Sequence, residues 1–504
     1  MSSGSEIDAE FQALPLKKLA AAALQRAGDF HAEHADFRLE RLRSQRLSLR
    51  DGALIDGSEG DDLGFAVRVI IDGAWGFAAG ASLTLDEVVR VTEQAVRVAM
   101  VSKPIASERI ELAAEPVYAD VIWISPYERD PFVISVAEKV ELLQHWSTGL
   151  LAASGVDHVS AEVTQVRENK FYADNHGTTT TQQRLRIHPQ LEIYGGDRTR
   201  GLFDSMRTTA PPAGRGWEYL TGDHVDWQSE LTQLPDLLAE KLSAPSVRPD
   251  SYDLVIDPTN LWLTIHESIG HATELDRALG YEANYAGTSF ATVDRLGSLQ
   301  YGSPQLNVTG DRTTPHGLAT IGYDDDGVAT QEWDLIKEGV LVGYQTDRRM
   351  AHRMGWGRSN GCAYADSPGH IPIQRMANVS LLPAAAPVST ADLISAVDRG
   401  IYIVGDKSWS IDMQRYNFQF TGQRFFAIRG GELQGQVREV AYQATTTEFW
   451  GSMEAVGGAD TWQLAGAFNC GKAQPGQVAA VSHGCPSALF RDIRVLNTTA
   501  EGGR

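Results

Sequence analysis

The first half of the chain alternates between two hydrophobic periods. Apolar and polar residues alternate in residues 35–57 and 63–80, as they do in β-strands. Asp51-Gly52 and Asp72-Gly73 interrupt these runs, and Asp-Gly is a preferred pair for a two-residue hairpin turn. In residues 83–102, apolar side chains instead recur every three or four positions. The pattern predicts strands joined by tight turns, followed by an amphipathic helix.

Residues 131–154 predict a second helix, and residues 158–196 return to strict alternation. Alternation over so long a stretch is typical of a polar-faced antiparallel sheet. Residues 1–25 predict a polar leader and then an amphipathic helix, not a signal peptide. The first half is therefore expected to be an α/β sandwich-like unit, with helices packed on a sheet.

A change of pattern divides the chain near residue 245. Proline and serine interrupt the periodicity in residues 240–251, and the apolar run "YDLVIDP" then predicts a buried strand. Many short strands follow, separated by the turn pairs Asp326-Gly327, Glu338-Gly339 and Gly430-Gly431. We predict an α+β protein with an N-terminal α+β domain over residues 1–245. A β-rich C-terminal domain with one or two helices is expected over residues 246–504.

Composition narrows the kinds of partner. The chain has 504 residues, 42% of them hydrophobic, and a formal net charge of -21. So acidic a surface repels nucleic acid and anionic membranes, and no segment offers the roughly 18 apolar residues of a membrane helix. Cys362, Cys470 and Cys485 are odd in number and far apart, which argues against disulfides and favours a reducing compartment. We expect a soluble, cytoplasmic protein.

The stretch "TIHESIGHAT" carries the candidate chemistry. It approaches the zinc-protease pattern H-E-x-x-H, but the step from His266 to His271 is one residue too long. On a regular helix, residues five apart differ by about 140° around the axis and cannot share a metal. A π-type bulge, or a helix that ends near Gly270, would bring the two histidines together. Glu267 is expected on the polar side of this helix.

The surrounding residues predict a helix over residues 260–279, capped by Thr259 or Asn260 and ended by Gly280. Zinc in such a site needs a third protein ligand. The candidates are Glu274 and Glu282 nearby, and Cys470, His483 and Cys485 much later in the chain. Thiolate binds zinc well, although most free cysteines are small buried hydrophobes. Spacing does not choose among these candidates.

Several motifs, in order, resemble those of the TldD/PmbA family of cytoplasmic metalloproteases. They are "HESIGHATELDRALGYEANYAGTSF", "GYDDDGVATQEWDLIKEGVLVGYQTDRRMAHRMG", "RMANVSL", "NFQF" and "CGKAQPGQ", with "GFAVRVIIDGAWGFAAG" in the first half. The likeness spans roughly residues 30–495 and includes the longer spacing H-E-x-x-x-H that belongs to the family pattern. After Cys470, "GKAQPGQ" is longer than the "GK-GQ" form associated with the family.

By this resemblance, His266 and His271 are zinc ligands, Cys470 completes the metal site and Glu267 is the catalytic glutamate. PmbA-type members, which are TldE-like, lack the histidine motif, so this chain resembles the TldD-type subunit. The resemblance also implies cleavage of unfolded or extended peptides in an enclosed site. It further implies a dimer, formed with a PmbA-like subunit or with a second copy of this chain.

Other functions stay open from the residues alone. A non-hydrolytic regulatory or peptide-binding protein would hold a structural zinc and would need no base at Glu267, and relatives described as gyrase modulators fit this alternative. A zinc amidohydrolase would act on small molecules instead of peptides. "GAFNCGKA" also matches the phosphate-loop pattern G-x-x-x-x-G-K, but Ala473 replaces the required Ser or Thr and "QPGQ" blocks the helix that should follow.

Overall fold

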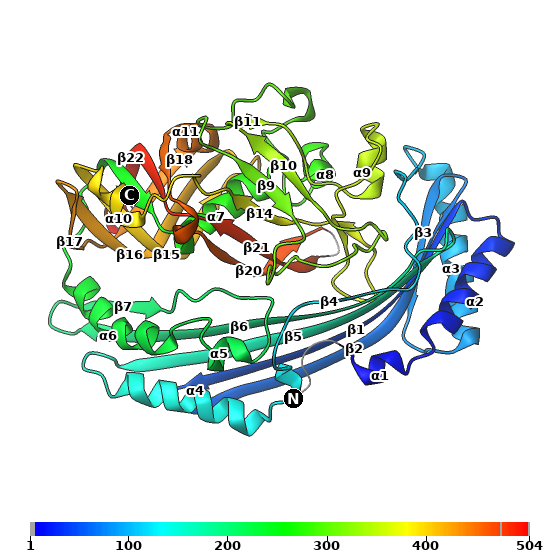
Figure 1. Ribbon diagram of the computed structural model, residues 1–504, viewed down its shortest axis with the longest axis horizontal. Coiled ribbons are helices and arrows are strands. Elements are labelled where there is room, and N and C mark those ends of the chain that lie inside the picture. Colours follow the sequence, from blue (N-terminus) through cyan, green and yellow to red (C-terminus); the bar gives the residue numbers. More distant parts are fainter. Residues whose placement is uncertain (1–5, 474–475, 502–504) are drawn as a thin grey trace.

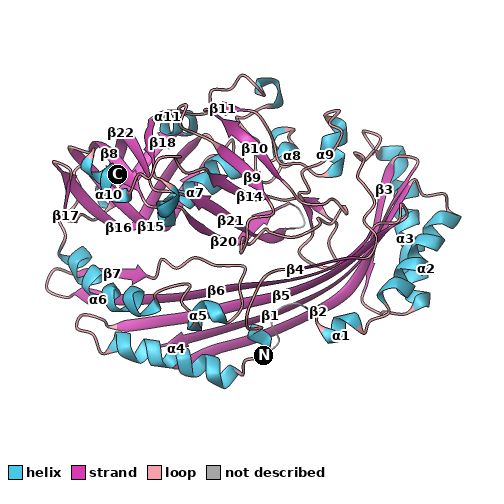
Figure 2. Ribbon diagram, in the orientation of Figure 1, coloured by secondary structure: helices cyan, strands magenta, loops and turns pink. Residues whose placement is uncertain are grey.

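The computed structural model describes residues 6–473 and 476–501. A long, curved sheet forms most of the first half, and a β-rich second half lies against it (Figures 1 and 2). Helices occur in both halves, so the predicted α+β class with a β-rich C-terminal region is confirmed. The division of the chain into domains at residue 245 stays a prediction.

Seven strands form the first sheet, in the order β3-β2-β1-β5-β6-β4, with β7 paired to β6. They are β1 His34–Arg50, β2 Ala53–Ile71, β3 Ala74–Gly80, β4 Val121–Ile124, β5 His158–Asp174, β6 Thr179–Asp197 and β7 Leu202–Arg207. The predicted Asp-Gly turns join β1 to β2 and β2 to β3. Asp51 and Gly52 have φ values of 52° and 78°, the left-handed pair that a type I′ turn requires.

Two pairs of helices pack on one face of this sheet, one pair at each end (Figure 1). They are α2 Leu16–Asp29 with α3 Leu85–Ser102, and α4 Val136–Leu151 with α6 Trp227–Ser243; the single turns α1 Ala9–Gln12 and α5 Glu218–Thr221 lie beside them. Side chains such as Phe37 and Val67 fill the core under α2 and α3, and Leu143 and Leu191 fill the core under α4 and α6. The helices expected in this half are therefore present.

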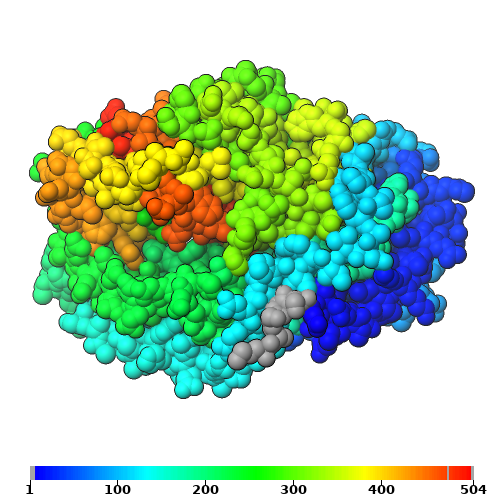
Figure 3. Space-filling model, in the orientation of Figure 1, coloured from blue at the N-terminus to red at the C-terminus, as the bar shows by residue number. Residues whose placement is uncertain are grey.

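The other face of the sheet is polar, as the alternation predicted, but it is buried beneath the second half. The two halves meet across the width of the molecule (Figure 3). Lys170 donates to Asp325 of the second half at 2.8 Å, and Glu168 accepts from the Tyr364 hydroxyl at 2.9 Å. We call the paired residues of this contact the interface cluster: Glu168, Lys170, Arg184, Arg186, Asp325 and Tyr364. All six are at most 5% exposed.

Five strands of the second half close into a ring. They are hydrogen-bonded in the order β15-β8-β22-β18-β16, and β16 pairs again with β15. Their bounds are β8 Asp250–Ile256, β15 Arg399–Ile411, β16 Asn417–Arg429, β18 Val440–Thr445 and β22 Ala488–Asn497, flanked by β17 Glu432–Gln436 and β19 Met453–Val456. Beside the ring lie β9 Val308–Asp311, β10 Glu332–Lys337, β11 Val340–Leu341, β12 Ala363–Tyr364, β13 Ile373–Gln374, β14 Asn378–Leu381, β20 Gln463–Lys472 and β21 Gln477–Cys485.

Short helices are more numerous in the second half than the one or two expected. The described residues contain α7 Pro258–Ile265, α8 Leu275–Ala278, α9 Arg348–Arg353, α10 Thr390–Ser395, α11 Thr446–Gly451 and α12 Thr498–Glu501. None exceeds eight residues, so none is long enough to display an apolar period in the sequence. No helix in the described ranges is long and apolar enough to cross a membrane.

The helix α7 is fixed to the ring through its side chains. Asn260 donates to the carbonyl of Gly405 at 2.9 Å and accepts from the Tyr442 hydroxyl at 2.9 Å. The Thr264 hydroxyl lies 2.8 Å from the same Tyr442 oxygen. Every residue of α7 is buried. The residues that follow it are therefore held in a defined position.

Candidate metal centre

The helix α7 continues into one turn of π-helix, His266–Gly270. The His271 amide donates to the carbonyl of His266 at 3.0 Å, five residues back instead of the four of an α-helix. The two imidazole centroids are consequently 4.7 Å apart, so the predicted bulge is confirmed. The helix begins earlier than expected, at Pro258, because the Asp257 carboxylate accepts a backbone amide of the first turn.

Side chains from distant elements stabilise the π turn. The Tyr301 hydroxyl donates to the carbonyl of Ser268, and Gln345 Nε2 donates to that of Gly270 at 2.7 Å. A Cβ added at Gly270 would lie 2.6 Å from Met376 Sδ. A larger residue at position 270 would therefore require the Met376 side chain to move. The carbonyl groups of Ser268 and Gly270 in the distorted turn have donors. Tyr301 and Gln345 carried no signal in the sequence because both contacts are tertiary.

Three side chains converge beside this turn. His266, His271 and Cys470 each bring one possible ligand atom to within 4.8 Å of the others. Cys470 comes from β20, at an irregularity in its pairing with β21, and its Sγ lies 3.6 Å from His271 Nε2. All three residues are 5% exposed. We call them the ligand cluster, and within residues 6–473 and 476–501 it is the single group of its kind.

Glu274 orients the second histidine. His271 Nδ1 donates to Glu274 at 2.8 Å, since a carboxylate can only accept, and this leaves the Nε2 lone pair free. Lys472 donates to Glu274 at 3.1 Å and to Asp276 at 2.8 Å. Burial raises the pKa of Glu274, but Lys472 and His271 hold it well below its ordinary value. The "GK" after Cys470 thus supplies a buried counter-charge.

His483 orients the first histidine. His483 Nδ1 lies 2.8 Å from the carbonyl of Val379, so it must carry the proton and donate. Burial, together with His266, holds the pKa of His483 well below 6.5, so its Nε2 is an acceptor. That atom is 2.7 Å from His266 Nδ1, which therefore donates. The free lone pair of His266 is on Nε2, as it is in His271.

The protonation states agree with this arrangement. Burial raises the pKa of the Cys470 thiol, but attraction to His271 and the hydrogen bond with it bring the pKa below the ordinary 9.0. Burial lowers the pKa of His266 below 6.5. Neutral imidazole and thiolate are the forms that bind zinc.

The other candidate ligands lie outside the ligand cluster. Glu274 and His483 each hydrogen-bond one of the histidines instead of joining them. Cys485 Sγ contacts a backbone carbonyl of α7 at 3.6 Å, and Glu282 accepts a backbone amide at 3.3 Å. Part of the longer "GKAQPGQ" loop, residues 474–475, lies outside the described residues.

Glu267 is on the π turn, beside His266. It is 5% exposed, so it faces a buried site and not the polar outer surface that helical phase predicted. Burial raises the pKa of Glu267, but the two histidines, Arg415 and a hydrogen bond from Trp409 bring it below 4.5. Arg415 Nη1 contacts its Oε2 directly. Sequence reasoning missed Arg415 and Trp409, because the β15–β16 hairpin delivers them from a distant part of the chain.

A cavity of about 250 Å³ adjoins this centre, between the two halves. Trp262 lines it and lies 6.2 Å from the His266 ring, centroid to centroid. Trp409 and Phe468 line it from β15 and β20, and His188 of β6 lies 5.7 Å from the Phe468 ring. Aromatic side chains thus form part of a wall that also includes polar and small residues, and Trp262 lies between this cavity and His266.

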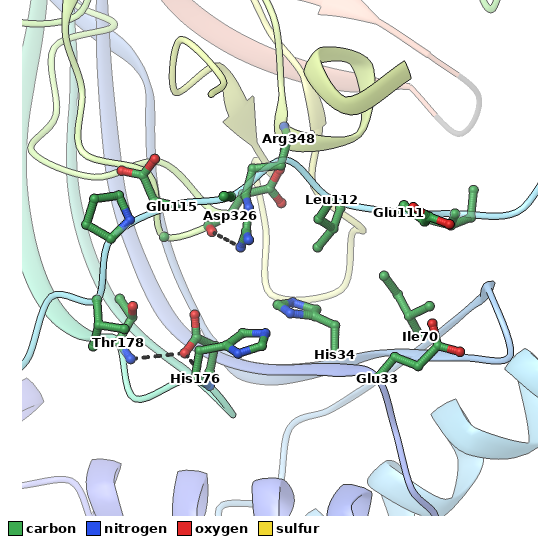
Figure 4. A pocket seen from close by; sticks show the side chains of 16 residues that line it. Glu33, His34, Ile70, Glu111, Leu112, Glu115, His176, Thr178, Asp326 and Arg348 are labelled. Atoms are coloured by element: carbon green, nitrogen blue, oxygen red, sulfur yellow. Dashed lines mark hydrogen bonds between the residues drawn. The ribbon is translucent and has the colours of Figure 1, made fainter. Parts of the chain in front are cut away.

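A second cavity, of about 510 Å³, lies at the far end of the long sheet (Figure 4). Its acidic side chains already have partners: Glu33 accepts from Arg109 at 2.9 Å, and Asp326 accepts from Arg68 at 2.6 Å. No three metal-binding side chains converge there among the residues described. The chemistry is therefore sought at the ligand cluster.

Known families match both halves of the chain. A model of the PmbA/TldA metallopeptidase domain 1 matches residues 35–99. A model of the PmbA/TldA metallopeptidase C-terminal domain matches residues 249–497, which include the ligand cluster, Glu267 and the β15–β16 hairpin.

Relatives and solved structures extend over nearly the whole length. A metalloprotease of Methanothermobacter thermautotrophicus is 26% identical over 467 residues, 92% of this chain and 96% of that protein. A zinc metalloprotease TldD homolog of Saccharolobus solfataricus is 22% identical over 480 residues, 94% of this chain and 98% of the other. TldE from Thermococcus kodakarensis has a similar fold, with a TM-score of 0.69 at 17% identity, covering 94% of this chain and 98% of that one.

Proposed function

This chain belongs to the PmbA/TldD metallopeptidase family, and we propose that it cleaves peptide bonds with a zinc ion held by His266, His271 and Cys470. The observation that carries this proposal is the convergence of three buried donor atoms of the kinds zinc prefers, next to the buried carboxylate of Glu267. A relative named as a zinc metalloprotease supports the choice of metal.

The donor set fits zinc. Both histidines present Nε2, because their Nδ1 atoms are engaged by Glu274 and His483, and the third donor is the sulfur of Cys470, which would bind zinc as a thiolate. Catalytic zinc sites use three protein ligands of this kind and leave one position for water. A zinc ion bound here would acidify that water and polarise the substrate carbonyl.

Glu267 is the proposed general base. Its low pKa keeps it ionised at neutral pH, so it can accept a proton from the attacking water. The water oxygen bonds to the carbonyl carbon and the C–N bond breaks. Glu267 then passes the proton to the departing amine nitrogen. Arg415 contacts the carboxylate directly and holds it in place for this transfer.

Extended peptides are the proposed substrates. Among the described strands, β20 pairs with β21 alone, and Arg375 donates to its Cys470 carbonyl. The part of its other edge before Cys470 is the proposed site for a peptide backbone. Ala465, Ala467 and Phe468 of this strand line the cavity beside Trp262, and the strand continues to Cys470. A peptide paired with β20 would therefore reach the ligand cluster while one of its side chains entered the cavity.

The active form is proposed to be a dimer, with a PmbA-like subunit that lacks the histidine motif or with a second copy of this chain. The similarity of its fold to TldE supports an assembly of related subunits. Native mass spectrometry of the chain alone, and mixed with such a subunit, distinguishes the two assemblies.

The test uses the purified chain, with and without a motif-lacking subunit. Zinc is measured by inductively coupled plasma mass spectrometry, and cleavage is followed with an unstructured fluorogenic peptide. We expect one zinc per chain, and we expect Glu267→Gln to keep the zinc and lose at least about 10³-fold in kcat/KM. A Glu267→Gln protein that still cleaves the peptide would remove the proposed base.

The alternatives have different outcomes in the same assay. A regulatory protein with structural zinc would cleave nothing, and its biological effect would survive Glu267→Gln. An amidohydrolase would cleave small amides and leave the peptide intact.

A further inference from the structure

We propose that Arg415 is a catalytic residue, which donates to the scissile carbonyl oxygen as that oxygen becomes negatively charged. The inference rests on the proposed function and adds a residue to it. Arg415 lies at the tip of the hairpin between β15 and β16, next to Glu267. No sequence motif discussed above includes it.

The hairpin tip holds Arg415 in an unusual backbone conformation. Its φ is 64°, in the left-handed region that residues with side chains rarely adopt. The Asp412 carboxylate fixes the tip by accepting from the amides of Gln414 at 3.1 Å and Tyr416 at 2.8 Å. The hydroxyl of Thr446 donates to the Arg415 carbonyl at 2.8 Å. The tip is thus built to place this one side chain.

The guanidinium is buried, yet most of its donors are unused. The side chain is 14% exposed, and burial lowers its pKa while Glu267 opposes that change. Among the described residues, its one side-chain hydrogen bond is the contact from Nη1 to Glu267, and Nε is buried without an acceptor. A guanidinium has five N–H donors, so Arg415 can hold Glu267 and still donate to a substrate oxygen.

The other cations near the ligand cluster are committed elsewhere. Lys472 is bound by Glu274 and Asp276. Arg375 donates to the carbonyls of Cys470 and of Gln477, the latter at 3.0 Å. Arg277 donates to the carbonyl of Ala286 and lies 3.6 Å from Glu274. Among the residues that the structure describes, Arg415 is the arginine that contacts Glu267 directly.

The donor set explains why a cation is needed. A thiolate at Cys470 would offset one of the two positive charges of a bound zinc ion, so the ion would stabilise the negative charge that develops on the substrate oxygen less. A fixed donor aimed at that oxygen lowers the barrier by an amount worth about 10²–10³-fold in rate. Arg415 supplies both the charge and the donor.

The experiment compares Arg415→Ala and Arg415→Lys in the zinc-loaded chain, on the peptide that the wild type cleaves. We expect Arg415→Ala to lower kcat/KM by about 10²–10³-fold with zinc content unchanged. Millimolar guanidinium should restore at least about tenfold of this loss, because it can occupy the vacated space. Arg415→Lys keeps the positive charge but not the planar guanidinium group. Its kcat/KM should fall by about tenfold or more, and added guanidinium should not restore it. Arg399→Ala is the matched control and should behave as the wild type, because Arg399 is an exposed residue of β15 paired with Asp250 at 2.7 Å.

Binding gives a readout that does not depend on turnover. Calorimetry with a phosphinic pseudopeptide, which carries the tetrahedral anionic oxygens, should show weaker binding to Arg415→Ala by a factor close to the loss in kcat/KM. A reduced-amide peptide, which lacks the carbonyl oxygen, should bind both proteins equally. Equal weakening of the two ligands would mean that Arg415 only positions Glu267, and would overturn the proposal.

Two further outcomes contradict it. One is a loss of less than about threefold in kcat/KM for Arg415→Ala. The other is a loss restricted to peptides with a free C-terminal carboxylate, because that would mean that Arg415 binds the end of the peptide chain. Amidated and free-acid peptides separate these cases. Failure of the proposed function is distinguishable, because the wild type would then cleave no peptide or Glu267→Gln would remain active.

Discussion

The chain buries two groups of polar side chains, and they differ in how their charges are satisfied. In the interface cluster, Glu168 accepts from Arg184 at 2.9 and 3.0 Å, from Arg186 at 2.9 Å and from Tyr364 at 2.9 Å. In the ligand cluster, the two Nε2 atoms and the Cys470 sulfur face one another. Apart from the contact between Cys470 Sγ and His271 Nε2 at 3.6 Å, the hydrogen bonds of the two rings are made on their outer sides. Burial of polar groups is common to both clusters, so convergence of donor atoms that lack protein partners is what marks a metal site.

The largest effect is expected when the third member of the ligand cluster, Cys470, is replaced. Cys470→Ser should bind no stoichiometric zinc and should have no detectable peptidase activity, because serine is a poor zinc ligand. Metal analysis and the fluorogenic assay measure both. Cys485→Ser is the matched control, since this buried cysteine contacts a backbone carbonyl outside the ligand cluster. Zinc retained by Cys470→Ser would contradict the assignment.

A substitution in the interface cluster should lower the stability of the protein and leave its zinc content unchanged. Glu168→Gln leaves two buried guanidinium groups without their carboxylate, which we expect to cost about 3–5 kcal/mol of the free energy of unfolding. The zinc content of the folded protein should not change. Urea unfolding measures the first effect and metal analysis the second. Glu162 is the control, because it lies on the same strand as Glu168 and makes a partly exposed ion pair with Arg46. Glu162→Gln should cost less than about 1 kcal/mol of the free energy of unfolding.

A smaller effect is expected at His483, which orients a ligand without binding metal itself. His483→Phe removes the acceptor for His266 Nδ1, so we expect zinc affinity to fall by about 10–100-fold. His483→Gln can still accept from His266 and donate to the carbonyl of Val379, and should keep most of the affinity. Competition with a chelator measures the dissociation constants. Equal affinities for the two variants would rule out a role for the hydrogen bonds.

The smallest effect concerns pH and the edge of the interface cluster. Burial raises the pKa of Glu40, next to Lys170, from 4.5 to about 7. The unfolded carboxyl loses its proton first as pH rises, so stability from this group is complete below pH 4.5 and is lost as pH rises through about 7. Between pH 5 and 8 the wild type should lose about 1–3 kcal/mol more than Glu40→Gln. Parallel pH profiles of unfolding would show that Glu40 does not titrate in this range.

Local patterns in the sequence were sufficient for the long strands, the Asp-Gly turns and the helices at Leu85 and Val136. Each depends on contacts between near neighbours or on backbone conformation. The sequence did not predict that the polar face of the first sheet is buried, because the residues that cover it, such as Asp325 and Tyr364, come from much later in the chain. Alternation shows that a face is polar and does not show what covers it.

At the metal centre, too, the sequence predicted the local features and not the tertiary ones. The six-residue span from His266 to His271, with Gly270 inside it, was sufficient to predict a distortion of the helix, and the structure shows that this distortion is a π turn. Spacing alone did not select Cys470, for which the family resemblance was needed. The roles of His483 and Arg415 could not be predicted, because the strands that carry them approach α7 only in the folded chain.

The buried pair between Lys472 and Glu274 has a consequence for recognising such centres in sequences that have no structure. Loss of either residue alone leaves an uncompensated buried charge, so substitutions at the two positions should be tolerated only together. A compound signature follows, H-E-x-x-x-H-x-x-E with C-x-K far downstream. A chain that keeps H-E-x-x-x-H-x-x-E and lacks the lysine of C-x-K would be a candidate for binding a different metal or for having lost its catalytic activity.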